Sequence, residues 1–125
     1  MRLIGARILA LRPGYCAIEL PYRDDLTQQH GYLHAGIVAA IADSAGGYAG
    51  FTLFPDDAGV LTVEYKLNLI APAEGERFVA EAQVAKPGRT LAITRGEVYA
   101  EGAAGRTLCA IMQQTLIVMA GRPGH

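Results

Sequence analysis

Charged residues, cysteines and long apolar runs are all scarce in this sequence of 125 residues. Charged side chains make up 18% of the residues and leave a formal net charge of −1, which argues against binding to nucleic acid or to an anionic membrane surface. No apolar run reaches the ~20 residues that a membrane-spanning helix needs. Because hydrophobic residues nevertheless reach 51%, we expect a further buried surface, such as a subunit interface.

The two cysteines, Cys16 and Cys109, lie far apart and match no metal-binding or redox spacing. We interpret them as reduced structural thiols, which are typical of a cytoplasmic protein. The N-terminal segment 1–14 carries arginines inside its apolar run and lacks a small-residue cleavage site, so it is interpreted as a strand rather than a signal peptide. The chain shows no linker or repeat and is predicted to form one domain, 1–125, with 121–125 as a flexible tail.

The most informative stretch is 34–50, a run of small and apolar residues with one carboxylate, Asp43, in its middle. The pattern predicts a helix from about Ala35 to Leu53, ended by Pro55. A helix that is apolar all round must be wrapped by protein, and this run is too short and too rich in Ala and Gly to span a bilayer. An ionisable group in such a place is costly unless it is paired or used. Asp43 is therefore the first residue to explain.

Strands are predicted on both sides of this helix. Their ranges are 3–11, 15–20, 60–70, 76–86, 90–100 and 106–119, with a polar loop at 21–33. In 60–70, apolar residues alternate strictly with polar ones, which predicts a half-buried strand with one face of each kind. The apolar set is Leu61, Val63, Tyr65, Leu67 and Leu69, and the polar set is Thr62, Glu64, Lys66 and Asn68. Hairpin succession of the last four strands would give an antiparallel sheet curled around the helix, an α+β fold.

This order of elements resembles the hotdog fold, and more narrowly the acyl-CoA thioesterases of the phenylacetyl-CoA (PaaI-like) type. The resemblance covers nearly the whole chain and rests on His34-Ala35-Gly36, on Asp43 seven residues after Gly36, and on LTVEYKLNLIAP from Leu61 to Pro72. Two positions differ from the usual family pattern. Ala35 stands where a glycine often follows the histidine, and Gln28 stands where the family often has Asn. Both differences bear on the choice of substrate more than on the class of reaction.

Asp43 is the candidate general base or nucleophile. Thioester hydrolysis needs a carboxylate that either activates water or attacks the carbonyl carbon directly, and the sequence does not separate these roles. The alternative is a structural carboxylate that makes a cap or salt bridge inside the fold.

Ala35 and Gly36 open the predicted helix, where N–H groups lack intrahelical partners and can hold a developing oxyanion. The alternative is a plain helix start with small residues for packing. Asp43 shares a face with Gly36 but lies roughly 10 Å further along the axis, too far for both to act on one thioester. A two-fold homodimer with antiparallel helices would bring the start of one helix to Asp43 of the other, and the resemblance implies the same arrangement. A dimer of dimers is expected beyond this minimum unit.

Three further residues are expected near the reacting group. Gln28, on the loop before the helix, could orient water or the thioester carbonyl, or be an exposed amide. Thr62 matches a position where relatives carry Ser or Thr, and its hydroxyl could hold the attacking water, or it is an ordinary strand residue. His34 could lie beside the substrate or be a structural residue. It is not expected to be the base, because a helix that included it would place it roughly 180° from Asp43.

Other residues are candidates for binding the rest of an acyl-CoA. Tyr48 and Phe51 could line an acyl tunnel or belong to the core. CoA phosphates call for basic residues near the mouth of the site, each of which could equally be a solvated surface charge. The candidates are Lys66 and Arg89, with Arg77 and Arg95 also available. His30 and His34 are separated by Gly31 on a loop, so no metal site is expected, and no cofactor is needed.

The leading interpretation is an enzyme that hydrolyses an acyl-CoA to a carboxylic acid and CoA, without nucleic-acid or membrane partners. The first rival is a non-catalytic module of the same fold that binds acyl or CoA ligands, which gains nothing from a buried carboxylate. The second rival is an enoyl-CoA hydratase or dehydratase of the same superfamily. The resemblance implies that such enzymes pair the carboxylate with a histidine close after it. No histidine follows Asp43 until His125, which disfavours this interpretation.

Overall fold

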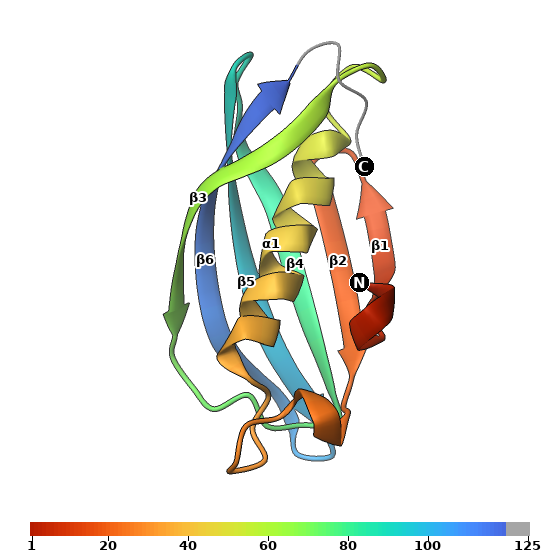
Figure 1. The fold of residues 1–125 in the computed structure, drawn as a ribbon, viewed down its shortest axis with the longest axis vertical. Helices are drawn as coiled ribbons and strands as arrows, with labels where there is room; N and C mark the ends of the chain where they lie inside the picture. Colours follow the sequence, from red (N-terminus) through yellow and green to blue (C-terminus); the bar gives the residue numbers. More distant parts are fainter. Residues whose placement is uncertain (120–125) are drawn as a thin grey trace.

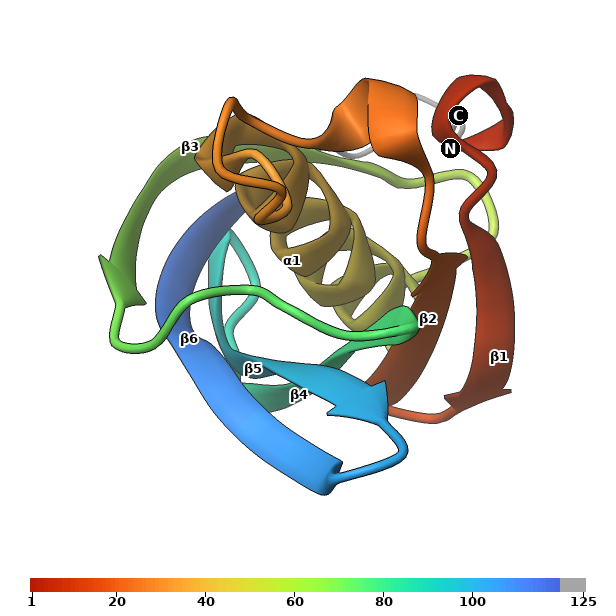
Figure 2. The ribbon, with the colours of Figure 1, turned by 90° about the horizontal axis from the view of Figure 1, so that it is seen from below.

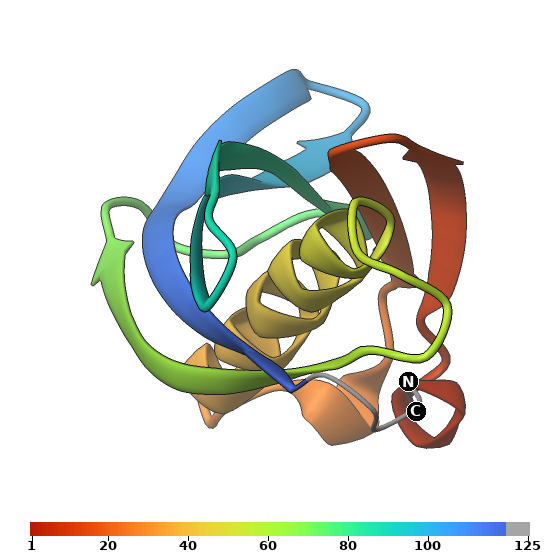
Figure 3. The same cartoon turned by 90° about the horizontal axis from the view of Figure 1, so that it is seen from above.

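The structure, a computed structural model, describes residues 1–119, so the predicted tail at 121–125 lies outside the described residues. One helix, α1 (Ala35–Phe51), lies against a six-stranded antiparallel sheet (Figure 1). The strands are β1 (Arg7–Arg12), β2 (Tyr15–Pro21), β3 (Gly59–Leu69), β4 (Arg77–Pro87), β5 (Leu91–Gly102) and β6 (Gly105–Met119). Their order in the sheet is β1-β2-β4-β5-β6-β3. Viewed from either end, the sheet curls around α1, with β1 and β3 at its edges (Figures 2 and 3).

The helix forms as predicted, and it ends at Phe51 rather than Leu53. Thr52 follows as the C-cap residue, and its hydroxyl donates a 2.7 Å hydrogen bond to the carbonyl of Ala49. The residues of α1 that pack against the sheet are aliphatic or glycine: Val38, Ile41, Ala42, Ala45, Gly46, Ala49 and Gly50. Together with inward side chains of β2, β4, β5 and β6, most of them form the main core. No helix within residues 1–119 is long and apolar enough to cross a membrane.

Two predictions, about where the first strand begins and about how the third strand pairs, are wrong. The predicted strand at 3–11 begins only at Arg7, because Gly5 (φ 83°) ends a short 3₁₀ turn over Arg2–Ile4 and redirects the chain. The segments 60–70 and 76–86 do not form a hairpin, since β3 pairs with β6 at the far edge and not with β4. The link between them passes across the end of the sheet at which α1 begins (Figure 2).

The two-residue alternation of β3 is interrupted by a β-bulge between Thr62 and Glu64. Before the bulge Thr62 pairs with the buried Leu116, and after it Tyr65 pairs with the buried Gln114. Directly opposed residues point to the same face, so Thr62 and Tyr65 both face the helix side although they are three residues apart. The prediction that Leu61, Val63, Tyr65, Leu67 and Leu69 share one face is therefore wrong.

Large apolar side chains of β3 remain exposed in the single chain. Leu61, Val63, Tyr65 and Leu69 are 55%, 52%, 47% and 54% exposed. The expectation of a strand with one buried face is thus not met by this chain alone. Exposed apolar surface concentrated on an edge strand is typical of a surface that another chain covers.

Candidate active site

Asp43 lies in the middle of α1, half-buried, at the centre of a small hydrogen-bonded cluster. The hydroxyl of Thr62 on β3 donates to Asp43 Oδ1 at 2.7 Å. Nε2 of Gln114 on β6 donates to the same Oδ1 at 2.6 Å and to the backbone carbonyl of Asp43 at 3.1 Å. Gln114 Oε1 in turn accepts from the hydroxyl of Thr94 on β5 at 2.8 Å. The bulge in β3 is what turns Thr62 toward this cluster.

The two carboxylate oxygens of Asp43 differ in the hydrogen bonds that they accept. Oδ1 accepts both side-chain hydrogen bonds, whereas Oδ2 accepts none from residues 1–119. A carboxylate held in this way keeps one oxygen able to take a proton from water or to attack a carbonyl carbon. Neither of the two side chains that donate to Asp43 is a histidine.

A separate cavity of about 540 Å³ lies at the start of α1. Gln28, His34 and Ala35 line it together with mostly apolar residues of the β3–β4 link, such as Ile70 and Pro72. The loop that carries Gln28 is held in place by a 2.9 Å bond from the Leu33 N–H to the Ala73 carbonyl. The structure thus gathers three of the predicted site residues, Gln28, His34 and Ala35, around one concave space.

His34 acts as the N-cap residue of α1. Its Nδ1 accepts a 2.9 Å hydrogen bond from the N–H of Gly36. Of the two amides predicted to hold an oxyanion, that of Gly36 therefore already has an acceptor. The N–H of Ala35 has none among the described residues, and Ala35 lines the cavity.

The cavity and the Asp43 cluster are separate within one chain. Asp43 and Thr62 do not line the cavity, and no hydrogen bond joins the two parts among residues 1–119. Ala35 and Asp43 are eight residues apart, about 12 Å along the axis at 1.5 Å per residue. One chain therefore presents the cavity and the Asp43 cluster at two separate places along one helix.

The residues predicted to bind the acyl chain and CoA are not gathered at the cavity. Tyr48 packs against the main core, and Phe51 packs against a smaller cluster of Val60, Ala92 and Leu116. The β4–β5 turn carries the exposed Arg89 at the end of the sheet where α1 ends, far from the cavity of the same chain (Figure 1). Arg77 is engaged by Glu19 and Glu101.

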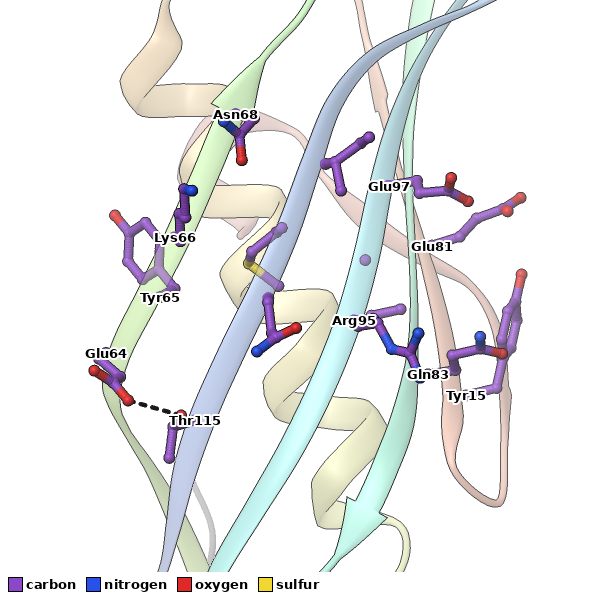
Figure 4. Close-up of a pocket in the computed structure, with 15 residues that line it drawn as sticks. Tyr15, Glu64, Tyr65, Lys66, Asn68, Glu81, Gln83, Arg95, Glu97 and Thr115 are labelled. Atoms are coloured by element: carbon purple, nitrogen blue, oxygen red, sulfur yellow. Dashed lines mark hydrogen bonds between the residues drawn. The ribbon is translucent and has the colours of Figure 1, made fainter.

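Lys66 and Arg95 line a second hollow, of about 700 Å³, on the outer face of the sheet (Figure 4). The three carboxylates of Glu64, Glu81 and Glu97 line the same hollow and outnumber the two cations. This balance of charge does not favour an anionic group such as a CoA phosphate. The structure therefore does not bring Lys66 to the cavity at the start of α1.

Both cysteines are buried and unpaired, as the sequence predicts. Burial raises the pKa of the Cys16 thiol to about 11 and also raises the pKa of Cys109. Cys109 lines the cavity, but its Sγ donates to the Val98 carbonyl at 3.2 Å. Neither thiol is poised as a nucleophile, because the thiolate is the reactive form.

Sequence reasoning missed Gln114, Thr94 and Gly46. A signal for Gln114 exists in β6, where Ala110, Met112, Gln114 and Leu116 recur every second residue and are all buried. A polar residue at a core-facing position of such a series is the informative exception. Thr94 and Gly46 carry no comparable signal, since their relation to Gln114 depends on the packing of α1 against β5 and β6.

Comparison with known proteins bears on the family and the fold of this chain. Residues 30–105, more than half of the chain, match the thioesterase superfamily. The chain belongs to the thioesterase superfamily, and the predicted hotdog fold and thioester-hydrolase class are confirmed at this level.

Particular relatives are similar over most of the chain. The crystal structure of a thioesterase family protein from Silicibacter pomeroyi superposes with a TM-score of 0.95 at 50% identity, over 97% of this chain and 89% of that one. A variant of the phenylacetic acid degradation protein PaaI from Thermus thermophilus gives 0.82 at 29% identity, over 94% and 96%. Human acyl-coenzyme A thioesterase 13 is 31% identical over 95 residues, 74% of this chain and 67% of the relative. The chain spans 68% and 63% of two other curated relatives, both putative esterases of Saccharolobus solfataricus.

Proposed function

We propose that the protein hydrolyses acyl-CoA thioesters to a carboxylic acid and CoA, with Asp43 as general base or nucleophile. The observation that carries the proposal is the Asp43 carboxylate, held through Oδ1 by Thr62 and Gln114 with Oδ2 accepting no hydrogen bond from residues 1–119. The acyl-CoA substrate is supported by the likeness to human acyl-coenzyme A thioesterase 13. In the reaction a C–O bond forms from water and the C–S bond breaks. The departing thiolate of CoA takes up a proton.

The active site is completed by a second copy of the chain. Ala35 and Asp43, the two half-sites, lie about 12 Å apart on one helix, so two antiparallel helices related by a two-fold axis would set each Ala35 opposite the other chain's Asp43. Gly36, Ala40, Asp43 and Gly47 line the incompletely buried face of α1, and three of these residues are small enough for close approach of a second helix. The exposed apolar side chains of β3 supply further surface for such a dimer.

In that dimer the residues take these roles. The N–H of Ala35 polarises the thioester carbonyl at the start of one helix, and Gln28 orients the carbonyl or the water. Asp43 and Thr62 come from the other chain. The β4–β5 turn, at the end of the sheet where α1 ends, is brought toward the partner's helix start, which suits Arg89 to a CoA phosphate (Figure 1). Further association into a dimer of dimers stays a prediction, as does the single domain over 1–125.

A substrate panel tests the proposal directly. Release of CoA thiol is measured with a thiol reagent for aryl-acetyl, benzoyl-like and medium-chain acyl-CoAs, with wild type and Asp43→Asn side by side. Wild type should turn over at least one class, and Asp43→Asn should turn over none above about a hundredth of the wild-type rate. Binding of all acyl-CoAs without thiol release would instead identify a non-catalytic module.

A further inference from the structure

We infer that Gln114 is a positioning residue that fixes the Asp43 carboxylate for catalysis. Thr94 holds the other end of the Gln114 amide, and the lack of a side chain at Gly46 leaves room for this amide. The inference rests on the proposed function and extends it to three residues outside the predicted site. Gln114 acts through Asp43 and does not itself meet the substrate in this assignment, because it is 1% exposed.

The first support is the place of Gln114 in β6. Its inward neighbours two residues away on the strand, Met112 and Leu116, are apolar and 1% and 0% exposed. An amide in such a position costs free energy unless it is fully hydrogen-bonded, and an aliphatic residue would fill the same space. The amide is hydrogen-bonded at both ends, and its Nε2 donates to Asp43 Oδ1 and to the Asp43 carbonyl. It therefore ties both the side chain and the backbone of Asp43 to the sheet.

The second support is the direction of the amide. A glutamine can present either its oxygen or its NH₂ group, and only the NH₂ group can donate to a carboxylate. Asp43 Oδ1 and the Asp43 carbonyl can only accept, so they direct Nε2 toward themselves. The Thr94 hydroxyl, 0% exposed, donates to Gln114 Oε1 at 2.8 Å and so supplies the donor that this direction of the amide requires. Without this hydroxyl Oε1 would be buried without that donor, and the amide would be held at one end only.

The third support is that both donors meet one carboxylate oxygen. Thr62 from β3 and Gln114 from β6 both donate to Oδ1, which holds the plane of the carboxylate from two strands. Oδ2 is then the atom presented for reaction. A shift of about 1 Å in the position of a reacting group can lower the reaction rate on the order of 100-fold.

The fourth support is the missing side chain at Gly46, three residues after Asp43 on α1. A Cβ at this position would lie 2.0 Å from Gln114 Oε1 and 2.8 Å from Thr94 Oγ1. Any larger residue would displace the amide from its place between Thr94 and Asp43. The helix can thus approach β5 and β6 closely enough for these bonds because residue 46 is glycine.

The central experiment compares Gln114→Met with Gln113→Met in the full chain. Both substitutions replace an amide by an unbranched apolar side chain of similar length, but Gln113 is exposed on the outer face of the same strand. With the best acyl-CoA of the panel, Gln114→Met should lower kcat by about tenfold or more and leave KM within about threefold. Gln113→Met should behave like wild type. A kcat for Gln114→Met equal to that of Gln113→Met would overturn the inference.

A double variant separates positioning from a merely structural role. If Gln114 acts through Asp43, adding Gln114→Met to Asp43→Asn should leave the residual rate unchanged. An additional loss equal to that of Gln114→Met alone would overturn the inference. Should Asp43→Asn itself remain active, the proposed function falls and the inference falls with it. Should Asp43→Asn be inactive while Gln114→Met is fully active, only the inference falls.

Two further variants keep the test decisive if Gln114→Met folds poorly. Thr94→Val should lower kcat without raising KM. The control is Thr115→Val, which removes a hydroxyl that donates to Glu64 on the outer face and should leave kcat unchanged.

Gly46→Ala should lower both kcat and the melting temperature. Adding Gln114→Ala to Gly46→Ala should restore the melting temperature but not kcat. Recovery of kcat in that double variant would show that the amide is dispensable and would overturn the inference.

Discussion

The N–H of Gly36 donates to Nδ1 of His34, two residues earlier, across 2.9 Å. This bond closes the first turn of α1 and uses an amide that would otherwise point out of the helix start. The only helix-start amide without an acceptor that also borders the cavity, within residues 1–119, is that of Ala35. His34 thus shapes the helix start, and in the proposed mechanism the amide that holds the oxyanion is that of Ala35 alone rather than the predicted pair.

Replacement of Asp43 by Asn should abolish turnover with little effect on acyl-CoA binding. Asn keeps the shape of the side chain and its acceptor for the Thr62 hydroxyl, but it removes the charge that takes a proton or attacks carbon. A loss of at least about 10²-fold in kcat is expected, as for other removed acid–base groups. Steady-state thiol release and acyl-CoA binding are measured on the same preparation. Activity above a tenth of wild type would exclude Asp43 as the reacting group.

Replacement of Thr62 by Val should lower kcat less than Asp43→Asn does. One of the two hydrogen bonds to Oδ1 is lost and the other, from Gln114, remains. About 1–1.5 kcal/mol is at stake, which corresponds to roughly a tenfold loss. Thr62→Ser, which keeps the hydroxyl, serves as the control and should retain most of the wild-type rate. Equal rates for the Val and Ser variants would assign Thr62 to the strand alone.

A mixture of two inactive variants should recover activity if the site is shared between chains. Ala35→Pro deletes the Ala35 N–H at the first helical position, where proline is tolerated, and His34 already has the extended backbone (ψ 136°) that precedes a proline. Asp43→Asn damages the other half-site. After joint refolding at equal amounts, half of the dimers should be mixed and half of their sites intact, so about a quarter of wild-type activity should return.

The control for this mixture is each variant refolded alone, which should stay inactive. If both variants fold and exchange chains but no activity returns, the site lies within one chain. A wild type that sediments as a monomer at the assay concentration would lead to the same conclusion.

Charge on the edge strand β3 should dissociate the dimer and remove its activity. Val63, 52% exposed, is replaced by Lys, with Leu9 on the opposite edge strand, 47% exposed, as the matched control. A lysine within a packed apolar interface leaves a charge without water or a partner, whereas at Leu9 it stays solvated. Sedimentation velocity should find Val63→Lys largely monomeric and Leu9→Lys unchanged. A Val63→Lys dimer with full activity would place the interface elsewhere.

Glu19 should make the fold sensitive to acid. A hydrogen bond from Arg7 lowers the pKa of this carboxyl below its ordinary value of 4.5, with Arg77 assisting and burial opposing. Because the folded pKa is the lower one, the stabilisation is present above pH 4.5 and is lost as the pH falls toward the folded value.

Urea unfolding of wild type and Glu19→Gln, measured between neutral pH and acid, checks this. The free energy of unfolding of wild type should fall in the window below pH 4.5 more steeply than that of Glu19→Gln. At neutral pH the variant should be the less stable of the two. Glu64→Gln, at an exposed carboxylate outside this ion pair, is the control and should follow wild type. Parallel curves for Glu19→Gln and wild type would contradict the prediction.

The sequence predicts the elements of this fold because its strongest patterns are local. The apolar helix around Asp43, the polar loop before it and the later strands each follow from residues close in the chain, and the structure contains them all, although the bulge interrupts the predicted alternation of β3. The contact of Thr62 with Asp43 confirms their predicted proximity, although strict alternation places Thr62 on the polar face and only the bulge turns it toward the helix. Where two distant segments had to be matched, as for β3 with β6, local patterns carry no information.

The Gln114 amide illustrates why the rest of the site escapes prediction. It is separated from Asp43 by 71 residues, and its Oε1 depends for its donor on Thr94 from a third element. The amide fits between the helix and the sheet only because residue 46 is glycine and has no side chain. Each of these residues is ordinary when taken alone, and their relation exists only after the helix has packed on the sheet.

The bulge between Thr62 and Glu64 has a consequence for insertions and deletions in this chain. Val63 is the extra residue there, since Thr62 pairs with Leu116 and Glu64 pairs with the adjacent Thr115. Deleting Val63 would remove the bulge and keep both Thr62 and Tyr65 on the helix side, because a regular strand places residues two apart on one face. Deleting Lys66, beyond the bulge, would instead turn Leu67 and Leu69 outward and Asn68 toward α1. Loss of one residue from β3 should thus be far less damaging at the bulge than a few residues after it.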